Sequence, residues 1–222
     1  MTEQSGSRSV AGDARVEGMR VFERAAEGWA SGRVDPAESV AAAEAAASDG
    51  VVRAAILVEG ASDRAALHAI ASAGARDLRR EGVAVLAMGG AMSIRRYVEV
   101  LGIDGIGLEL HGLCDVGEIR FFERAGMTAD TFEICDPDLE GELIRSLGVA
   151  AVEDVLATQN DLRLFRTFQR QPAQRERSPE QQLHRFLGTT SGRKEQYARE
   201  LSLAAAASHA VPDPLRRLLE QV

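Results

Sequence analysis

The chain has 222 residues, a formal net charge of −8 at pH 7 and 45% hydrophobic residues. This length is sufficient to bury a core, and it suits one medium domain or one domain with an appendage. No apolar run approaches the roughly 20 residues of a membrane span, so no membrane partner is expected. The N-terminus lacks the apolar core of a signal peptide, and we expect a cytoplasmic protein. Cys114 and Cys135 are too few for a zinc site and are expected to be small buried side chains.

The first 50 residues are predicted to be a leader followed by two helices. Residues 1–12 show no apolar periodicity and are expected to be disordered. The first helix is predicted over 16–30. The second is predicted to begin at Asp35-Pro36, which supplies an N-cap and a proline at the first helical position, and to run to about residue 47.

Residues 51–150 alternate short apolar runs with helical segments, which is typical of an α/β protein with a parallel sheet. Four strands are predicted, at 55–58, at 82–88, over 106–113 with an end at Cys114-Asp115, and at 131–135. The helices between and after them are predicted from about residue 62, over 92–101, over 118–124 and up to residue 147. Residues 151–222 are predicted to be a helical extension, with breaks near 172, 179, 188–192 and 212.

Three of the four predicted strands end in carboxylates. The first strand is followed by Glu59 and Asp63, the third by Asp115 and Glu118, and the fourth by Asp138, Glu140 and Glu142. Parallel strands end at one edge of the sheet, where α/β proteins bind ligands. The preference of acids for helix N-termini explains any one of these residues but not the whole set. Such oxygen-rich clusters suit hard cations such as Mg²⁺ or Mn²⁺.

The second predicted strand ends differently, at Gly89-Gly90. The pair favours a tight turn with positive φ. Backbone N–H groups that meet a phosphate at a helix N-terminus are the alternative.

Positive charge is concentrated in one C-terminal segment. Residues 162–199 contain nine basic and three acidic side chains, so this segment carries about +6 while the remainder carries about −14. An acidic crevice beside a basic flank is a workable arrangement for phosphodiester chemistry. A solvated, arginine-rich helical surface is the alternative.

Lys194 is the only lysine among 26 basic residues. If the chain uses arginine wherever a general positive charge is enough, the remaining lysine indicates a role that the planar guanidinium cannot fill. A point charge on a scissile phosphate or on the leaving oxygen would be such a role. Chance retention on a surface helix is the alternative.

Four segments together resemble the Toprim nuclease domain of the OLD (overcoming lysogenization defect) family. They are Leu57-Val-Glu-Gly-x-x-Asp63, Met88-Gly-Gly, Gly112-Leu-Cys-Asp-Val-Gly-Glu118 and Asp138-Leu-Glu-Gly-Glu-Leu-Ile-Arg145. The resemblance covers residues from about 51 to 200. It implies a Toprim-type parallel four-stranded sheet sandwiched by helices, with N-terminal helices and a C-terminal helical extension carrying Lys194.

The resemblance also implies roles for individual residues. Glu59 matches the characteristic glutamate and Asp63 its partner, Asp115 matches the first aspartate of an Asp-x-Asp motif, and Asp138 and Glu140 match the later acidic ligands. The second position of Asp-x-Asp is Gly117, and the nearest carboxylate is Glu118. Lys194 falls in a segment that resembles the Gly-x-Lys of the OLD active site.

These roles predict a metal-dependent nuclease that cleaves phosphodiester bonds with two Mg²⁺ or Mn²⁺ ions. DNA is expected as the partner more than RNA, with Arg95, Arg96, Arg193 and Lys194 near its backbone. The chain has no P-loop motif, so any ATPase is expected on a separate polypeptide, and a homodimer is possible. The four histidines (His68, His111, His184 and His209) are expected to be structural.

Two other functions fit the same residues. One is a non-catalytic nucleic-acid-binding or assembly factor of DNA repair or recombination, which Gly117 favours and Lys194 disfavours. The other is a small-molecule phosphohydrolase, which would not need so extended a basic segment.

Overall fold

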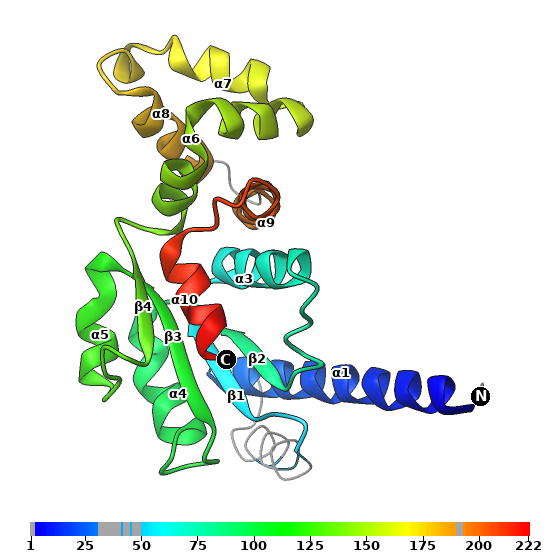
Figure 1. Cartoon of the computed structure of the whole chain (residues 1–222). Coiled ribbons are helices and arrows are strands. Elements are labelled where there is room, and N and C mark those ends of the chain that lie inside the picture. The colour runs from blue at the N-terminus through cyan, green and yellow to red at the C-terminus, as the bar shows by residue number, and fades with distance from the viewer. Residues whose placement is uncertain (1–2, 31–40, 42–44, 46–49, 190–192) are drawn as a thin grey trace.

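One parallel sheet organises the chain. The computed structural model describes residues 3–30, 41, 45, 50–189 and 193–222. The sheet has the order β2-β1-β3-β4, and all three pairings are parallel (Figure 1). The strands are β1 (Ala54–Val58), β2 (Val83–Ala87), β3 (Glu109–Asp115) and β4 (Phe132–Cys135). The predicted fold class is therefore confirmed.

Helices surround the sheet. They are α1 (Glu3–Ala30), α3 (Ala61–Ala73), α4 (Ile94–Leu101), α5 (Ile119–Arg124), α6 (Leu139–Thr158), α7 (Leu162–Gln169), α8 (Pro179–Thr189), α9 (Lys194–Ala207) and α10 (Asp213–Gln221). Short 3₁₀ turns lie at Ala91–Ser93, Val116–Glu118 and Pro172–Gln174. Within the described residues, none of the helices combines the length and apolar character needed to cross a membrane.

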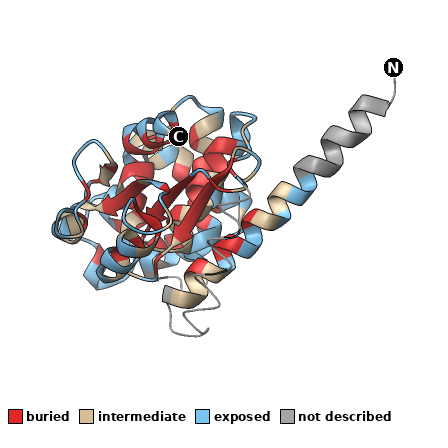
Figure 2. Ribbon diagram, turned by 90° about the horizontal axis from the view of Figure 1, so that it is seen from below, coloured by how far each residue is buried: buried red, intermediate tan, exposed pale blue. Residues whose placement is uncertain are grey.

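Both faces of the sheet are covered, which explains why the strands are continuous apolar runs. One face, which includes Ile56 and Val85, packs with residues of α3, α6, α9 and α10. The opposite face, which includes Leu57 and Leu86, packs with residues of α1, α4 and α5. Figure 2 shows the buried residues concentrated in the sheet and the adjoining sides of the helices. Both cysteines are buried and free, as expected.

The third strand begins later than the sequence predicts. Residues 106–108 are held by the end of α4, because Ile106 N–H donates to the Val100 carbonyl and Leu108 N–H to the Leu101 carbonyl. Gly107 between them has φ +83°. The strand ends at Asp115, in agreement with the predicted end at Cys114-Asp115.

The N-terminal helix begins at Glu3 and not near residue 16, so it extends into the segment predicted as a leader. That segment is rich in serine, glycine and charged residues, and its sequence gives no apolar periodicity from which a helix could be predicted. The second predicted helix, at about 35–47, lies outside the described residues except for positions 41 and 45.

The C-terminal extension is part of the sheet's own core. Leu201 of α9 and Leu215 of α10 are fully buried in the same cluster as Ile56. The predicted helix end at residue 147 coincides with a kink in α6 at the non-helical Gly148, which has φ +75°, and the helix resumes after it to Thr158. Figure 1 shows the later part of α6 with α7 and α8 standing away from the sheet, while α9 lies along α3.

Gly112 lets β3 pack closely against aromatic side chains, and its substitution tests this packing. A Cβ at this position would lie 2.6 Å from Phe122 Cε1 and 3.1 Å from Phe132 Cβ. Both rings are buried, so we expect Gly112→Ala to lower the free energy of unfolding by about 1–3 kcal/mol. Urea denaturation measures the effect. Gly117→Ala is the matched control, because a Cβ there has no atom within 4 Å, and equal stability of the two variants would contradict the prediction.

Candidate functional site

A cavity of about 360 Å³ lies at the carboxyl edge of the sheet. Its lining residues are Glu59, Gly60, Ser62, Asp63, Gly89, Gly90, Asp115, Leu139, Glu140 and Lys194. These residues come from the ends of three strands, the start of α6 and the start of α9. Five residues predicted for the site thus face one cavity although they are up to 135 positions apart.

The turn between β1 and α3 positions the first two carboxylates. Glu59 directly follows the strand, and Gly60 is the N-cap of α3. Gly60 N–H donates to Asp63 Oδ2 at 2.9 Å. Asp63 lies in the first turn of α3, so its carboxylate caps the N-terminus of its own helix. The cap is therefore made by Gly60 and Asp63, whereas the sequence suggests Ser62. Asp63 is only 9% exposed.

The glycine pair forms a tight turn that supports Glu59. Gly89 and Gly90 have φ of +71° and +124°, which side chains with a Cβ rarely adopt. Their N–H groups donate to the Glu59 carbonyl at 3.0 and 3.2 Å. Because these amides already have an acceptor, the turn explains the pair better than phosphate binding does.

The carboxylates raise one another's pKa. Burial, then the charges of Asp63, Asp138, Glu59 and Glu118, raise the pKa of Asp115 to about 7. Burial is also the main cause for Asp63, whose pKa rises to about 6. The pKa of Glu118 rises to about 7 because of burial and the adjacent Glu59, with which it shares a hydrogen bond.

The two later acids already have partners within the protein. Asp138 caps α6 by accepting from Gly141 N–H at 2.8 Å, and His184 Nε2 lies 2.9 and 2.7 Å from its two carboxylate oxygens. Glu140 Oε1 forms an ion pair with Lys194 Nζ at 3.0 Å. Both acids were predicted as metal ligands, but in this structure they hold a histidine and the lysine. His184 is therefore a site residue that was predicted to be structural.

Lys194 remains a cation in this setting. Burial lowers its pKa, but the carboxylate of Glu140 and the charges of Asp63 and Asp138 outweigh that effect, and the pKa is raised. The ammonium is thus available as a fixed positive charge beside the acids.

A buried clamp holds the start of the helix that carries Lys194. The carboxylate of Asp161, which is 6% exposed, accepts hydrogen bonds from the guanidinium of Arg193 and the hydroxyl of Tyr197. Tyr197 and Arg193 flank Lys194 on α9 and fix its first turn to the start of α7. Arg193 was predicted to contact nucleic acid, but here it serves this clamp.

Two other predicted contacts lie apart from the cavity. Arg95 on α4 pairs with Glu99 at 2.7 Å, and Arg96 lies over the Trp29 ring at 6.0 Å from its centroid. Both residues line a separate surface depression with Met92 and Ser93. The structure does not bring them to the acidic cavity.

The comparisons with known proteins agree with this arrangement. Residues 52–116 match the family described as overcoming lysogenization defect protein-like, TOPRIM domain. This part of the chain therefore resembles an OLD-like Toprim domain. A search of curated proteins found no match.

Solved structures share the fold of this Toprim domain and most of its surroundings. The C-terminal region of the Burkholderia pseudomallei OLD protein has a TM-score of 0.53 and 19% identity, over 77% of this chain and 96% of that one. The C-terminal region of the Xanthomonas campestris pv. campestris OLD protein has a TM-score of 0.53 and 21% identity, over 77% and 92%. Identities this low establish similarity of fold.

The acids of this Toprim domain fit a hard divalent cation by chemistry. Four carboxylates (Glu59, Asp63, Asp115 and Glu118) form no ion pair within the described part of the chain. Glu118 Oε2 is buried without a hydrogen-bond partner. As the side chains lie, no three His, Cys, Asp or Glu groups among the described residues converge closely enough to hold a metal. A cation would therefore have to draw these oxygens together.

This fit predicts how stability depends on pH and on Mg²⁺. The folded pKa values of Asp115 and Glu118, about 7, exceed the ordinary values of about 4. The folded metal-free state therefore binds protons more tightly than the unfolded chain does. Proton binding by these two acids stabilises the folded state at low pH, and that contribution is lost as the pH rises from about 4 through 7. We expect Mg²⁺ at pH 8 to raise the thermal unfolding midpoint, and Glu118→Gln to raise the metal-free midpoint while reducing the Mg²⁺ effect.

Thermal unfolding in a chelator and in Mg²⁺, from pH 5 to 8, measures both effects. Glu123→Gln is the matched control, because Glu123 is an exposed glutamate on the neighbouring helix α5. If Mg²⁺ stabilised the Glu118→Gln and wild-type proteins equally, Glu118 would have no part in holding the ion.

Proposed function

We propose that the chain is a divalent-metal-dependent nuclease that hydrolyses phosphodiester bonds of nucleic acid, with DNA as its expected substrate. One observation carries the proposal. Within the described part of the chain, carboxylates that form no ion pair line the same cavity as the chain's only lysine. The Toprim match and the OLD-like fold support it.

Glu59, Asp63, Asp115 and Glu118 are the residues that would hold the metal. Bound Mg²⁺ or Mn²⁺, in two sites, would supply a water nucleophile at neutral pH and a counter-charge for the leaving oxygen. Because the pKa values of Asp63 and Asp115 are about 6 and 7 without metal, a bound cation would displace protons from these acids. Asp138 and Glu140 would orient His184 and Lys194 at the rim of the metal site.

Lys194 supplies the positive charge that faces the phosphate. Its side chain is half exposed, so the ammonium can meet a strand entering from solvent while Glu140 holds it at the cavity. A preorganised cation that meets charge developing in the transition state lowers the barrier without reorganising when the reaction occurs. The lysine thus complements the acids, which would otherwise repel a nucleic acid.

A nucleic-acid-binding or assembly factor is the second candidate. Gly117 stands where the family motif has an acid, and Asp138 and Glu140 are engaged with His184 and Lys194. These observations would fit a Toprim fold that binds without cutting. A separate ATPase polypeptide, a homodimer, a role in DNA repair and a cytoplasmic location remain predictions.

Supercoiled plasmid separates the two candidates. With Mg²⁺ or Mn²⁺ we expect the wild-type protein to nick or linearise the plasmid, because the acids can hold the metal. Glu59→Gln should remove at least about 99% of the activity, since it deletes the charge of one ligand. Gel electrophoresis follows cleavage, Glu123→Gln is the control, and binding of DNA without cleavage by the wild type would favour the assembly factor.

Replacing Lys194 tests its part in the reaction. Lys194→Ala should lower turnover by about 10²-fold, the usual cost of losing one preorganised donor. Lys194→Arg should recover DNA binding but little of the rate, because the guanidinium fork has another reach and geometry. Initial rates at saturating plasmid measure both effects.

The control for this test also removes the negative charge of Glu140, which Lys194→Ala would leave without an ion-pair partner. Glu140 is 7% exposed and pairs with the lysine, so the single variant leaves a buried carboxylate alone. Lys194→Ala/Glu140→Gln avoids that cost. Full activity in the double variant would show that the lysine only neutralises Glu140.

A further inference from the structure

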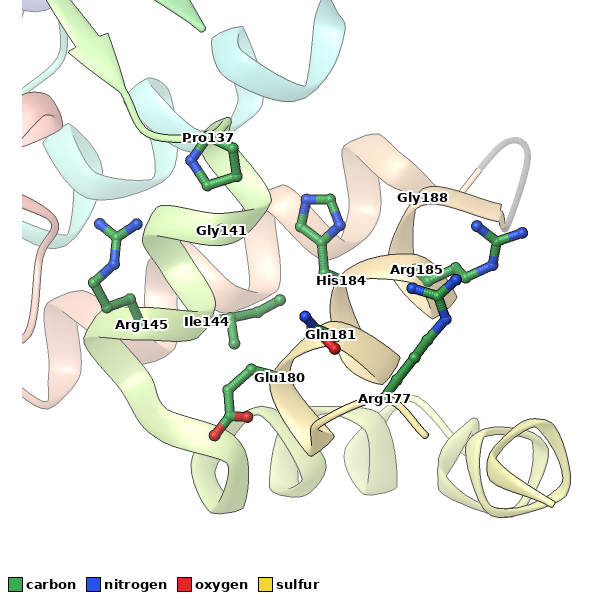
Figure 3. Close-up of a pocket in the computed structure, with 10 residues that line it drawn as sticks. All are labelled: Pro137, Gly141, Ile144, Arg145, Arg177, Glu180, Gln181, His184, Arg185 and Gly188. Atoms are coloured by element: carbon green, nitrogen blue, oxygen red, sulfur yellow. The ribbon is translucent and has the colours of Figure 1, made fainter. Parts of the chain in front are cut away.

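A second and larger cavity lies between the start of α6 and helix α8. It has a volume of about 630 Å³ and is lined by Pro137, Gly141, Ile144, Arg145, Arg177, Glu180, Gln181, His184, Arg185 and Gly188. Figure 3 shows Ile144 of α6 and Gln181 and His184 of α8 between the two helices, with Arg177 and Arg185 on the α8 side. The volume is within the range of small-molecule sites.

This cavity lies next to the acidic site along the first turn of α6. His184 lines it and also contacts the carboxylate of Asp138 at 2.7 Å. Gly141, another lining residue, is the N–H donor to the same carboxylate and follows Glu140 directly. The two cavities are thus less than one turn of helix α6 apart. A nucleic-acid strand with a phosphate at the acidic site can therefore reach the second cavity with a neighbouring nucleotide.

The lining combines an apolar floor with a basic rim. Ile144 and Pro137 supply the floor, and Gly141 has no side chain to fill it. Arg177 and Arg185 are exposed at the rim, while Glu180 is the single acid in the lining. An apolar floor accepts the face of a nucleobase, and guanidinium groups both stack on bases and bind phosphates.

We propose that this cavity takes one unpaired nucleotide of the substrate strand, with its base on the Ile144 floor and its phosphate at Arg177 and Arg185. The inference rests on the proposed nuclease function and deepens it. A base can enter only if it is unpaired, so the protein selects nucleic acid with single-stranded segments over a continuous duplex. The C-terminal helices thereby select the substrate that the acidic site receives.

Binding without divalent metal tests this proposal independently of catalysis. Fluorescence anisotropy in a chelator compares a blunt DNA duplex with a duplex of the same phosphate count that ends in a short single-stranded tail. We expect the tailed duplex to bind about 10-fold more tightly, as one accommodated base would give.

Gly188→Trp removes the space without changing any charge. A Cβ at Gly188 has no atom within 4 Å, so the indole can enter the cavity while the fold is kept. We expect this variant to bind both duplexes equally. Thr167→Trp adds the same bulk at an exposed position on α7 outside the cavity lining, and it should keep the preference for the tail.

Charge reversal tests the rim in the same way. Arg177→Glu/Arg185→Glu should weaken the tailed duplex at least 10-fold more than Arg163→Glu/Arg170→Glu, which makes the same charge change on exposed positions of the basic segment. Equal binding of tailed and blunt duplexes by the wild type would overturn the proposal, as would equal effects of the two tryptophan variants. A tail preference in a protein that cleaves nothing would leave the cavity assigned and refute the nuclease instead.

Discussion

Mutual repulsion among carboxylates at one sheet edge is the constraint on which the rest of the structure depends. A parallel sheet covered by helices brings the ends of its strands together, so acids placed there cannot avoid one another. Their pKa values rise because they are buried and lie near like charges. The folded protein must therefore hold protons or cations at this edge. Burying ionised carboxylates near one another costs free energy, and a bound divalent ion would offset that cost.

The C-terminal helices supply partners for two of the acids at this edge. His184 of α8 contacts Asp138, and Lys194 of α9 pairs with Glu140. These helices are held by the same core as the sheet, since Leu183 and Leu201 are buried in one cluster with Ile56. The extension therefore supplies the partners of Asp138 and Glu140, which the first 150 residues alone would lack.

The sequence predicts the parts of the site that depend on local pattern. Apolar runs locate all four strands, and the acids that follow them identify Glu59, Asp63 and Asp115 because strand ends share an edge. Lys194 is identified because it is the only lysine of the chain. The pairing of His184 with Asp138 spans 46 positions and depends on how α8 packs against α6, which no periodicity reports. The kink of α6 at Gly148 lies directly after the helix end predicted at residue 147, because a glycine with positive φ normally ends a helix.

The clamp at the start of α9 explains why adjacent basic residues do different work. Successive residues on a helix point about 100° apart. Arg193 therefore faces Asp161 when Lys194 faces Glu140, and the two cannot exchange places. The planar guanidinium serves the clamp, where it meets a buried carboxylate together with the Tyr197 hydroxyl. The compact ammonium serves the cavity, where a point charge on a flexible stem can meet both a protein acid and an incoming phosphate. A chain that otherwise uses arginine for positive charge thus keeps a lysine where reach matters more than a fixed fork.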